Sequence, residues 1–314
     1  MSYIADTHCD TLSLLSKNNF LCGSADMNLS LPRLLRGNIK LQCFAVCVHP
    51  DNNGKCFAEG IKLVDKFDKL ISDTELLTSV KTAEDITDLP GTSRIGAMLT
   101  VEGGDILDEN ENNIDILYER GMRMFSFTWN NSNFLCGGIG ENSSGLTQTG
   151  KNVLARCEEK GIIIDVSHIS EKGFFDVAQN SSVPFIASHS NAKKICSHKR
   201  NLSDEQLTVI KKCNGCVGIN FYPPFLNNSG IASVEDIIRH IEYIASLIGV
   251  EYICIGSDFD GVENNLPRGM EHPGKMQSIC ERLCRLNYPQ KYIDMICHEN
   301  IFRVLKNILP SQAD

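Results

Sequence analysis

Short apolar runs alternate with longer amphipathic stretches along most of this chain. Eight of these runs have the length and the aliphatic or aromatic content of β-strands. The first begins near Tyr3, and the other seven cover 41–48, 95–101, 122–128, 162–166, 184–187, 216–221 and 252–255. The pattern therefore predicts eight strands.

The stretches between these runs repeat their apolar residues at helical spacing. The predicted helices cover 57–70, 149–160, 171–179, 204–212 and 234–247, with additional helices within 274–309. Ser203 and Ser233 stand at the expected N-caps of two of them. Gly161 and Gly249 follow two helices at positions where a left-handed C-cap is expected.

Eight strands that alternate with helices predict a (β/α)8 barrel of the TIM type, with additional C-terminal helices. The 314 residues are consistent with one barrel domain over 1–314. An open doubly wound sheet is the alternative. It is disfavoured because the first strand leads into Asp6-Thr7-His8-Cys9-Asp10 and no Gly-x-Gly-x-x-Gly follows it.

Charge and composition narrow the classes of function. Lys and Arg number 30 against 39 Asp and Glu, and the basic residues are scattered, which argues against a nucleic-acid partner. No apolar run approaches a membrane span and no leader pattern opens the chain, so we expect a cytoplasmic protein. The 14 cysteines favour buried thiols, and Cys216 of the pair Cys213 and Cys216 is expected in the core.

Side chains with metal-binding chemistry follow several of the predicted strands. Catalytic groups of a (β/α)8 barrel collect at the carboxyl ends of its strands. The residues at these positions are His8, Asp10, Glu102, His168, His189, Asp258 and Asp260. Each one alone could be a hydrogen-bonded structural residue, but three imidazoles and several carboxylates on different strand ends indicate a metallohydrolase.

Six segments of the chain together resemble the membrane dipeptidase (renal dipeptidase) family, in its soluble bacterial form. The resemblance extends from Asp6 to the helices that follow Asp260. The segments are Asp6–Asp10, Val101–Gly104, Asp165–His168, Ser188–Ala192, Arg200–Asn201 and Gly256–Val262.

The resemblance implies a dipeptidase with two Zn²⁺ per chain that also accepts a D-residue at the C-terminal position. One zinc would be held by His8 and Asp10, the other by His168 and His189, and Glu102 would bridge both. A hydroxide shared by two zinc ions can form near neutral pH and attack the scissile carbonyl.

Two further residues match family positions that contact the substrate. Asp258 matches the acid/base carboxylate that takes a proton from water and passes it to the departing amine. Arg200 matches the residue that pairs with the free carboxylate of the dipeptide. Without the resemblance, Asp258 could cap a turn and Arg200 could be a solvated member of the basic stretch 193–200. Asp260 is expected to have the turn role.

Trp129 departs from the family pattern. The mammalian enzyme of the family has a His at this position, where it is thought to help stabilise the oxyanion. An indole donates one N–H but carries no charge, so Trp129 either gives weaker help or forms an apolar wall of the substrate pocket.

Two rival functions remain open at the level of sequence. One is a different binuclear amidohydrolase that acts on a cyclic amide, a related small amide or a phosphoester, although His8-x-Asp10 and a bridging Glu102 favour the dipeptidase. The other is a catalytically silent barrel that binds a partner, which the intact set of candidate ligands disfavours. The resemblance also implies a homodimer, and the lack of an apolar run long enough to span a membrane argues against a membrane partner.

Overall fold

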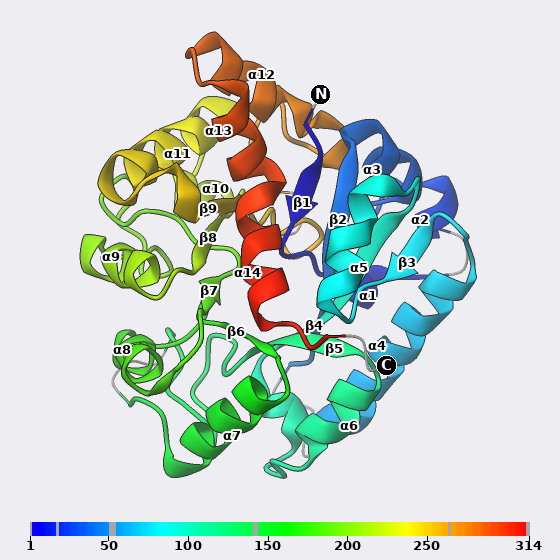
Figure 1. The fold of residues 1–314 in the computed structure, drawn as a ribbon, viewed down its shortest axis with the longest axis vertical. Helices are drawn as coiled ribbons and strands as arrows, with labels where there is room; N and C mark the ends of the chain where they lie inside the picture. The colour runs from blue at the N-terminus through cyan, green and yellow to red at the C-terminus, as the bar shows by residue number, and fades with distance from the viewer. Residues whose placement is uncertain (1, 17–18, 50–54, 141–143, 263–264, 312–314) are drawn as a thin grey trace. The chain divides into compact units, whose positions relative to one another are not determined.

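The computed structural model describes residues 2–16, 19–49, 55–140, 144–262 and 265–311. Within these ranges the chain forms nine strands, which alternate with helices along most of its length (Figure 1). The chain divides into two compact units. The first unit combines Met1–Cys43 with Ala187–Val304, and the second combines Phe44–Ile186 with Leu305–Asp314. The single domain expected over 1–314 stays a prediction.

Parallel strands form the centre of the first unit. β1 (Ile4–Asp6) pairs on one side with β2 (Ile39–Cys47) and on the other with β9 (Ile253–Ile255), and β9 also pairs with β8 (Cys216–Ile219). All residues of β1, β8 and β9 are buried. The register places Asp6 opposite Ile255, so β1 and β9 end side by side.

The second unit also contains a run of parallel strands. In chain order these are β3 (Leu77–Ser79), β4 (Ile95–Glu102), β5 (Met122–Ser126), β6 (Ile163–Asp165) and β7 (Ile186–Ala187), and each pairs with the next. Glu102 is the last residue of β4, opposite Ser126 at the end of β5, and Asp165 ends β6. Polar side chains therefore begin where these strands end.

Helices connect most of the strands. In the first half of the chain they are α1 (Thr11–Leu14), α2 (Asn19–Cys22), α3 (Leu31–Gly37), α4 (Cys56–Ser72), α5 (Ala83–Asp88), α6 (Asn113–Glu119) and α7 (Gln148–Glu159). In the second half they are α8 (Glu171–Asn180), α9 (Asp204–Lys212), α10 (Pro223–Leu226), α11 (Val234–Ile248), α12 (Gln277–Arg285), α13 (Gln290–Asp294), the π-helix η5 (Met295–Glu299) and α14 (Asn300–Ile308). Short 3-10 turns lie at η1 (Leu89–Gly91), η2 (Gly104–Leu107), η3 (Val250–Tyr252) and η4 (Pro273–Lys275).

All eight predicted strands are present, and so are the five predicted helices and the additional helices after β9. The prediction missed β3, because Leu77-Thr78-Ser79 has only three residues and only Leu77 of them is apolar. It also missed several short helices, including α3 and α5, which have too few turns to show a period.

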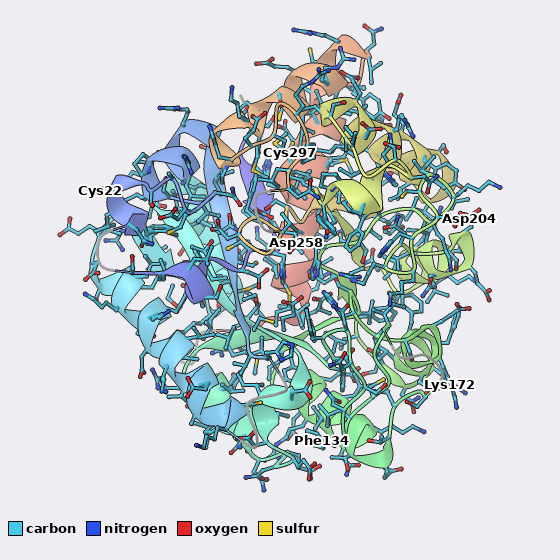
Figure 2. All side chains as sticks on the ribbon, turned by 180° about the vertical axis from the view of Figure 1, so that it is seen from behind. Cys22, Phe134, Lys172, Asp204, Asp258 and Cys297 are labelled. Carbon is cyan, nitrogen blue, oxygen red and sulfur yellow. The ribbon has the colours of Figure 1, made fainter. Side chains whose placement is uncertain are left out.

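The predicted helix caps are largely confirmed. Ser203 and Ser233 each form a capping box, with Gln206 and Asp236 as the third helical residues. Asp204 begins α9 directly after the first of these caps (Figure 2). Gly161 has φ 68°, as a left-handed position requires. Gly249 has φ 103° but ψ 157°, so its predicted left-handed helical conformation is wrong.

Two other sequence predictions can be compared with the structure. Cys216 is buried at the start of β8, which confirms its core position. Among the helices of the described ranges, none combines the length and the apolar character needed to cross a bilayer.

Candidate metal centre

The chain segments that follow β1 and β9 run side by side beyond the ends of the strands. Asp10 donates its backbone N–H to the carbonyl of Phe259 at 3.0 Å, and Asp258 donates its own to the carbonyl of His8 at 3.2 Å. Cys9 and Phe259 form an isolated parallel bridge between them. Because of this pairing, His8 and Asp258 face each other from sequence positions about 250 residues apart.

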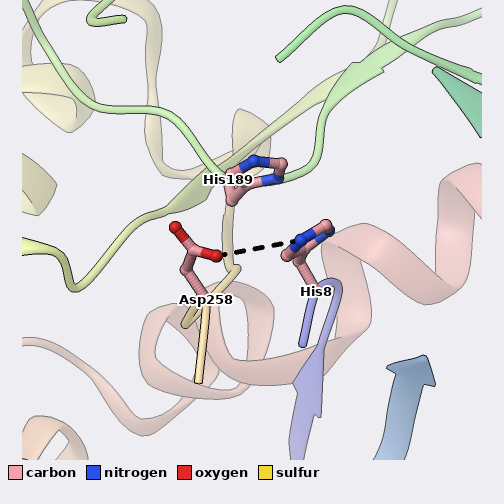
Figure 3. A group of neighbouring side chains, drawn as sticks. All are labelled: His8, His189 and Asp258. Atoms are coloured by element: carbon pink, nitrogen blue, oxygen red, sulfur yellow. Dashed lines mark ion pairs between the residues drawn. The ribbon is translucent and has the colours of Figure 1, made fainter. Parts of the chain in front are cut away.

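Four of the candidate residues meet in the first unit. His8 Nε2 lies 3.3 Å from Asp10 Oδ2 and 3.8 Å from Asp258 Oδ1. The rings of His8 and His189 stack with their centroids 3.8 Å apart, and Asp258 points toward both (Figure 3). One ligand atom each from His8, His189 and Asp258 lies within 4.8 Å of the others, a spacing that one cation can span.

Close backbone approaches hold His189 in this group. The Thr7 hydroxyl lies 2.5 Å from the carbonyl oxygen of Ser188 and 2.9 Å from that of Ile255. A Cβ added at Gly218 or Gly256 would lie 1.9 or 1.8 Å from that same Ser188 oxygen. Only glycine at both positions lets the segment before His189 pass this close to β8 and β9.

A second pair of candidate ligands meets in the other unit. His168 Nε2 lies 2.8 Å from Glu102 Oε1, and both side chains are buried. On the far side of its ring, His168 Nδ1 lies 3.1 Å from Asn130 Oδ1. The end of β6 is fixed by Asp165, which accepts hydrogen bonds from the Ser126 and Ser167 hydroxyls.

The hydrogen bonds of His168 fit a cation site. An amide oxygen only accepts, so Nδ1 of His168 carries the hydrogen that it donates to Asn130. In the neutral ring, the lone pair of Nε2 then faces a carboxylate oxygen of Glu102, which also only accepts. Two acceptors at this distance are stable only if a proton or a metal cation lies between them. His189 Nδ1 lies 2.7 Å from Ser188 Oγ, a hydroxyl that can donate or accept, so this contact orients the ring of His189.

The buried Asp6 and the half-buried Asp260 shape the loops around His8 and Asp258. Asp6 accepts hydrogen bonds from the backbone N–H and the hydroxyl of Ser257 at 2.8 and 2.5 Å. Burial raises the pKa of Asp6 to about 6, although these hydrogen bonds oppose the shift. Asp260 accepts hydrogen bonds from the backbone of Asn28 and from the Thr11 hydroxyl, so its carboxylate joins distant segments, and the turn role expected for it stays a prediction.

Gly103 and Gly104 follow Glu102 at a point where a neighbouring backbone comes close. Gly103 has φ 98°, and a Cβ there would lie 3.2 Å from the backbone nitrogen of Trp129. A Cβ at Gly104 would lie 2.6 Å from the carbonyl oxygen of Phe127. The neighbouring chain after β5 therefore requires both glycines.

Arg200 does not behave like the basic residues around it. Lys193, Lys194 and Lys199 are exposed, whereas Arg200 is buried. Its guanidinium lies 5.4 Å from the ring centroid of Phe225 and donates to the carbonyl of His189 at 3.3 Å. Because a guanidinium is costly to bury without a partner, a solvated surface role does not describe Arg200.

Trp129 lies beside a residue that the sequence did not single out. The rings of Trp129 and His49 are 5.6 Å apart and meet edge to face. His49 is exposed, and Trp129 is partly exposed. Nothing in the sequence indicated this contact, because 80 residues separate the two positions and His49 is followed by a polar stretch.

Sequence reasoning also missed Asn220 and Asn130. Asn220 donates to Asp258 Oδ2 at 2.9 Å, and it is the first residue after β8. Asn130 contacts His168 as described above. Polar residues at strand ends were the correct signal, but the predicted strand 216–221 included Asn220 and so concealed it.

Comparison with known proteins identifies the fold and the relatives of this chain. A family model described as membrane dipeptidase (peptidase family M19) matches residues 1–313. A Klebsiella pneumoniae protein described as an uncharacterized protein in the pqqA 5' region is 32% identical over 66% of this chain and 80% of its own length. Dipeptidase 3 of Rattus norvegicus is 28% identical over 97% of this chain and 65% of its own length.

Solved structures with the same architecture cover nearly the whole chain. A Rhodobacter sphaeroides metallo peptidase, crystallised with a phosphinate mimic of the dipeptide L-Ala-D-Ala, has a TM-score of 0.91 at 23% identity and covers 98% of this chain and 99% of its own. A dipeptidase of family M19 has a TM-score of 0.92 at 23% identity and covers 99% of both chains. The predicted (β/α)8 barrel fold is confirmed.

Proposed function

The chain belongs to the membrane dipeptidase family, peptidase family M19, and we propose that it uses two zinc ions to hydrolyse dipeptides, including those with a C-terminal D-residue. As a member of this metallopeptidase family the protein is a dipeptidase. The zinc, the number of ions and the tolerance for a D-residue are the proposal. The proposal rests on two clusters of side chains. In one cluster His8 meets Asp10, His189 and Asp258, and in the other Glu102 meets His168.

The metal ligands follow the family resemblance residue by residue. His8 and Asp10 would hold one ion, His168 and His189 would hold the other, and Glu102 would be shared by both. Imidazole nitrogens and carboxylate oxygens are the donors that zinc prefers. A bound zinc pair supplies a water of lowered pKa and polarises the scissile carbonyl. The hydrogen bonds at Nδ1 of His168 and His189 support this role, because they turn Nε2 of each ring toward the ligand group.

Asp258 is proposed as the residue that moves the proton. It accepts a proton from the attacking water and delivers it to the nitrogen of the departing amine, which is a poor leaving group until it is protonated. Its Oδ1 lies 3.8 Å from His8 Nε2, so the carboxylate faces the ligand group. Asp258 lies in the loop after β9 (Figure 2) and is 13% exposed, which leaves it accessible to a substrate.

Arg200 is proposed to bind the free carboxylate of the dipeptide. A guanidinium binds a carboxylate through two parallel hydrogen bonds. Arg200 would therefore select substrates whose C-terminal carboxylate lies beside its guanidinium. The burial of Arg200 and its contact with the carbonyl of His189 support the role, since they place a preorganised cation next to a candidate ligand. Trp129 is proposed to form an apolar wall for the substrate side chain, with His49 packed against the indole.

Three further sequence predictions stay predictions. These are the cytoplasmic location, the absence of a nucleic-acid or membrane partner, and a homodimer.

A dipeptide library tests the proposed function. The protein is freed of metal with a chelator, reloaded with Zn²⁺, and assayed on dipeptides of both stereochemistries at each position. We expect bound zinc near two ions per chain, cleavage of dipeptides including L-Ala-D-Ala, and loss of both activity and thermal stability in the chelated sample. Asp258→Asn is the matched control, with zinc retained and kcat lowered by about a hundredfold or more.

Two outcomes would contradict the proposal. Cleavage of a cyclic amide but of no dipeptide would identify another amidohydrolase. Zinc binding without hydrolysis of any amide would identify a silent barrel.

A further inference from the structure

We propose that Asn220 is a positioning residue that holds Asp258 in the orientation needed for proton transfer. The inference rests on the proposed role of Asp258 as the proton-transfer carboxylate. Asn220 is completely buried and directly follows β8, next to the strand that leads to Asp258. Its Nδ2 lies 2.9 Å from Asp258 Oδ2 and, more weakly, 3.5 Å from the carbonyl oxygen of His189, so we expect its effect to act mainly through Asp258.

The side-chain amide of Asn220 can take only one of its two orientations. Its Oδ1 accepts the backbone N–H of Tyr222 at 2.6 Å. An amide nitrogen cannot accept that hydrogen bond, so a flipped amide would leave the Tyr222 N–H facing another donor. The NH₂ group must therefore point the other way, where it donates to Asp258 Oδ2 at 2.9 Å.

The backbone of Asn220 is itself fixed by a second buried asparagine. The backbone N–H of Asn220 donates to Asn191 Oδ1 at 3.2 Å, and Asn191 Nδ2 donates to the carbonyl of Asn220 at 2.9 Å. Asn191 is completely buried and lies two residues after His189. These reciprocal hydrogen bonds tie the chain that carries His189 to the residue that holds Asp258.

The contact makes the two oxygens of Asp258 different. Oδ2 is held by Asn220, while Oδ1 faces His8 (Figure 3). The backbone of Asp258 is held as well, in the left-handed region at φ 64°, by its hydrogen bond to the carbonyl of His8. A carboxylate fixed at both its backbone and one oxygen needs no reorientation before it transfers a proton.

An amide suits this task better than other donors. It cannot take up or release a proton near neutral pH, so it does not compete for the proton that Asp258 transfers. It also carries no charge. A charged donor at this position would form an ion pair with Asp258 and could draw the carboxylate away from the ligand group. Asn and Gln combine these properties with a donor and an acceptor on separate atoms, as the contacts with Asp258 and Tyr222 require.

Two variants of Asn220 separate positioning from a merely structural role. Asn220→Ala removes the hydrogen bonds of the side chain to Asp258, to the Tyr222 N–H and to the carbonyl of His189. Asn220→Asp is isosteric and keeps an acceptor for the Tyr222 N–H, but it has no donor for Asp258. If Asn220 positions Asp258, both variants lose kcat by about tenfold or more with KM changed less than about threefold and bound zinc unchanged. If it only supports the fold, Asn220→Asp keeps the kcat of the wild type.

Asn300 offers a matched control. It is a buried Asn at the start of α14 whose Nδ2 donates to the carbonyls of Val250 and Ile253, so it lies at the opposite end of β9 from Asp258. Asn300→Ala should lower the melting temperature and leave kcat of the folded, zinc-loaded protein unchanged. Equal loss of kcat in Asn300→Ala and Asn220→Ala would overturn the inference.

A crystal structure of zinc-loaded Asn220→Asp keeps this test separate from the test of the proposed function. We expect the carboxylate of Asp258 to turn away from residue 220. An unmoved carboxylate would overturn the inference even if the variant were inactive. If the wild type and Asn300→Ala cleave no dipeptide, the proposed function fails, and the orientation of Asp258 in the variant still decides the positioning role.

Discussion

At the scale of single residues, burial separates Arg200 from its neighbours in sequence. Its guanidinium is enclosed by the Phe225 ring and the carbonyl of His189, while the lysines around it face solvent. A buried cation with a planar, preorganised donor pair is adapted to bind an anion, and a lysine at the same position could not give two parallel hydrogen bonds.

The first prediction concerns the replacement of Arg200. Arg200→Ala should raise KM for a dipeptide by about tenfold or more, because the substrate carboxylate loses a charge-assisted bidentate partner. Arg200→Lys should give a smaller rise. Steady-state kinetics on zinc-loaded protein measure the effect, and metal analysis should find the zinc content of the wild type. An unaltered KM in both variants would remove Arg200 from the substrate site.

The second prediction concerns Gly261, which lies against two carboxylates of the first unit. A Cβ at this position would lie 2.2 Å from Asp10 Oδ2 and 2.6 Å from Asp258 Oδ1. Gly261→Ala should therefore displace one or both carboxylates, with lower zinc content and a kcat reduced about tenfold or more. Gly91→Ala is the control, since an added Cβ there meets nothing within 4 Å. Full zinc content and an unchanged kcat in Gly261→Ala would contradict the prediction, because the carboxylates would then move aside without loss of metal binding or activity.

At the scale of the elements, local hydrogen bonds decide where helices begin. In α9, Ser203 Oγ accepts the backbone N–H of Gln206 at 3.2 Å, and Gln206 Oε1 accepts that of Ser203 at 2.9 Å. The short-range Ser-x-x-Gln pattern is visible in the sequence, which is why the predicted bounds of this helix agree with the structure.

The third prediction tests this cap. Ser203→Ala should destabilise the protein by about 1 kcal/mol and lower its melting temperature by roughly 1–3 °C, with kcat and KM unchanged. Thr208→Ala in the same helix is the control, because the Thr208 hydroxyl donates a hydrogen bond to the carbonyl of Asp204 in that helix and caps neither of its ends. That change should leave the melting temperature unaltered or raised. A larger loss in Thr208→Ala than in Ser203→Ala would contradict the prediction.

At the scale of the whole molecule, the buried imidazole of His240 links stability to pH. His240 lies on α11, accepts the backbone N–H of Ala192 at 3.1 Å and donates to the carbonyl of Leu226 at 3.0 Å. Burial lowers the pKa of His240 from 6.5 to about 4. The neutral ring thus joins α11 to the segment that follows His189.

The fourth prediction follows from this pKa. Below pH 6.5 the unfolded chain binds a proton at His240 that the folded chain does not bind until about pH 4, so stability falls as the pH decreases through this window. The full effect is about 3 kcal/mol. In His240→Gln this contribution is absent, so the difference in melting temperature between wild type and variant should narrow from pH 7 to pH 5. A constant difference would refute the assignment to His240.

Much of the fold could be predicted from the sequence, because short runs of apolar residues mark the strands and amphipathic helices of nine or more residues carry a visible period. The strand-end residues His8, Glu102, His168, His189 and Asp258 were identified for the same reason. Contacts set by tertiary packing could not be predicted. The burial of Arg200 within a basic stretch and the contact of His49 with Trp129 depend on which distant segments meet, and no local pattern encodes that.

The pairing of β1 with β9 has a consequence for biosynthesis. The segment that bears His8 leaves the ribosome before the strand beside it and Asp258, which lies about 250 residues further along the chain. At about 5–20 residues per second, the nascent chain waits roughly 12–50 s between these two events. A metal ion held by both segments would therefore be captured only after both have been translated.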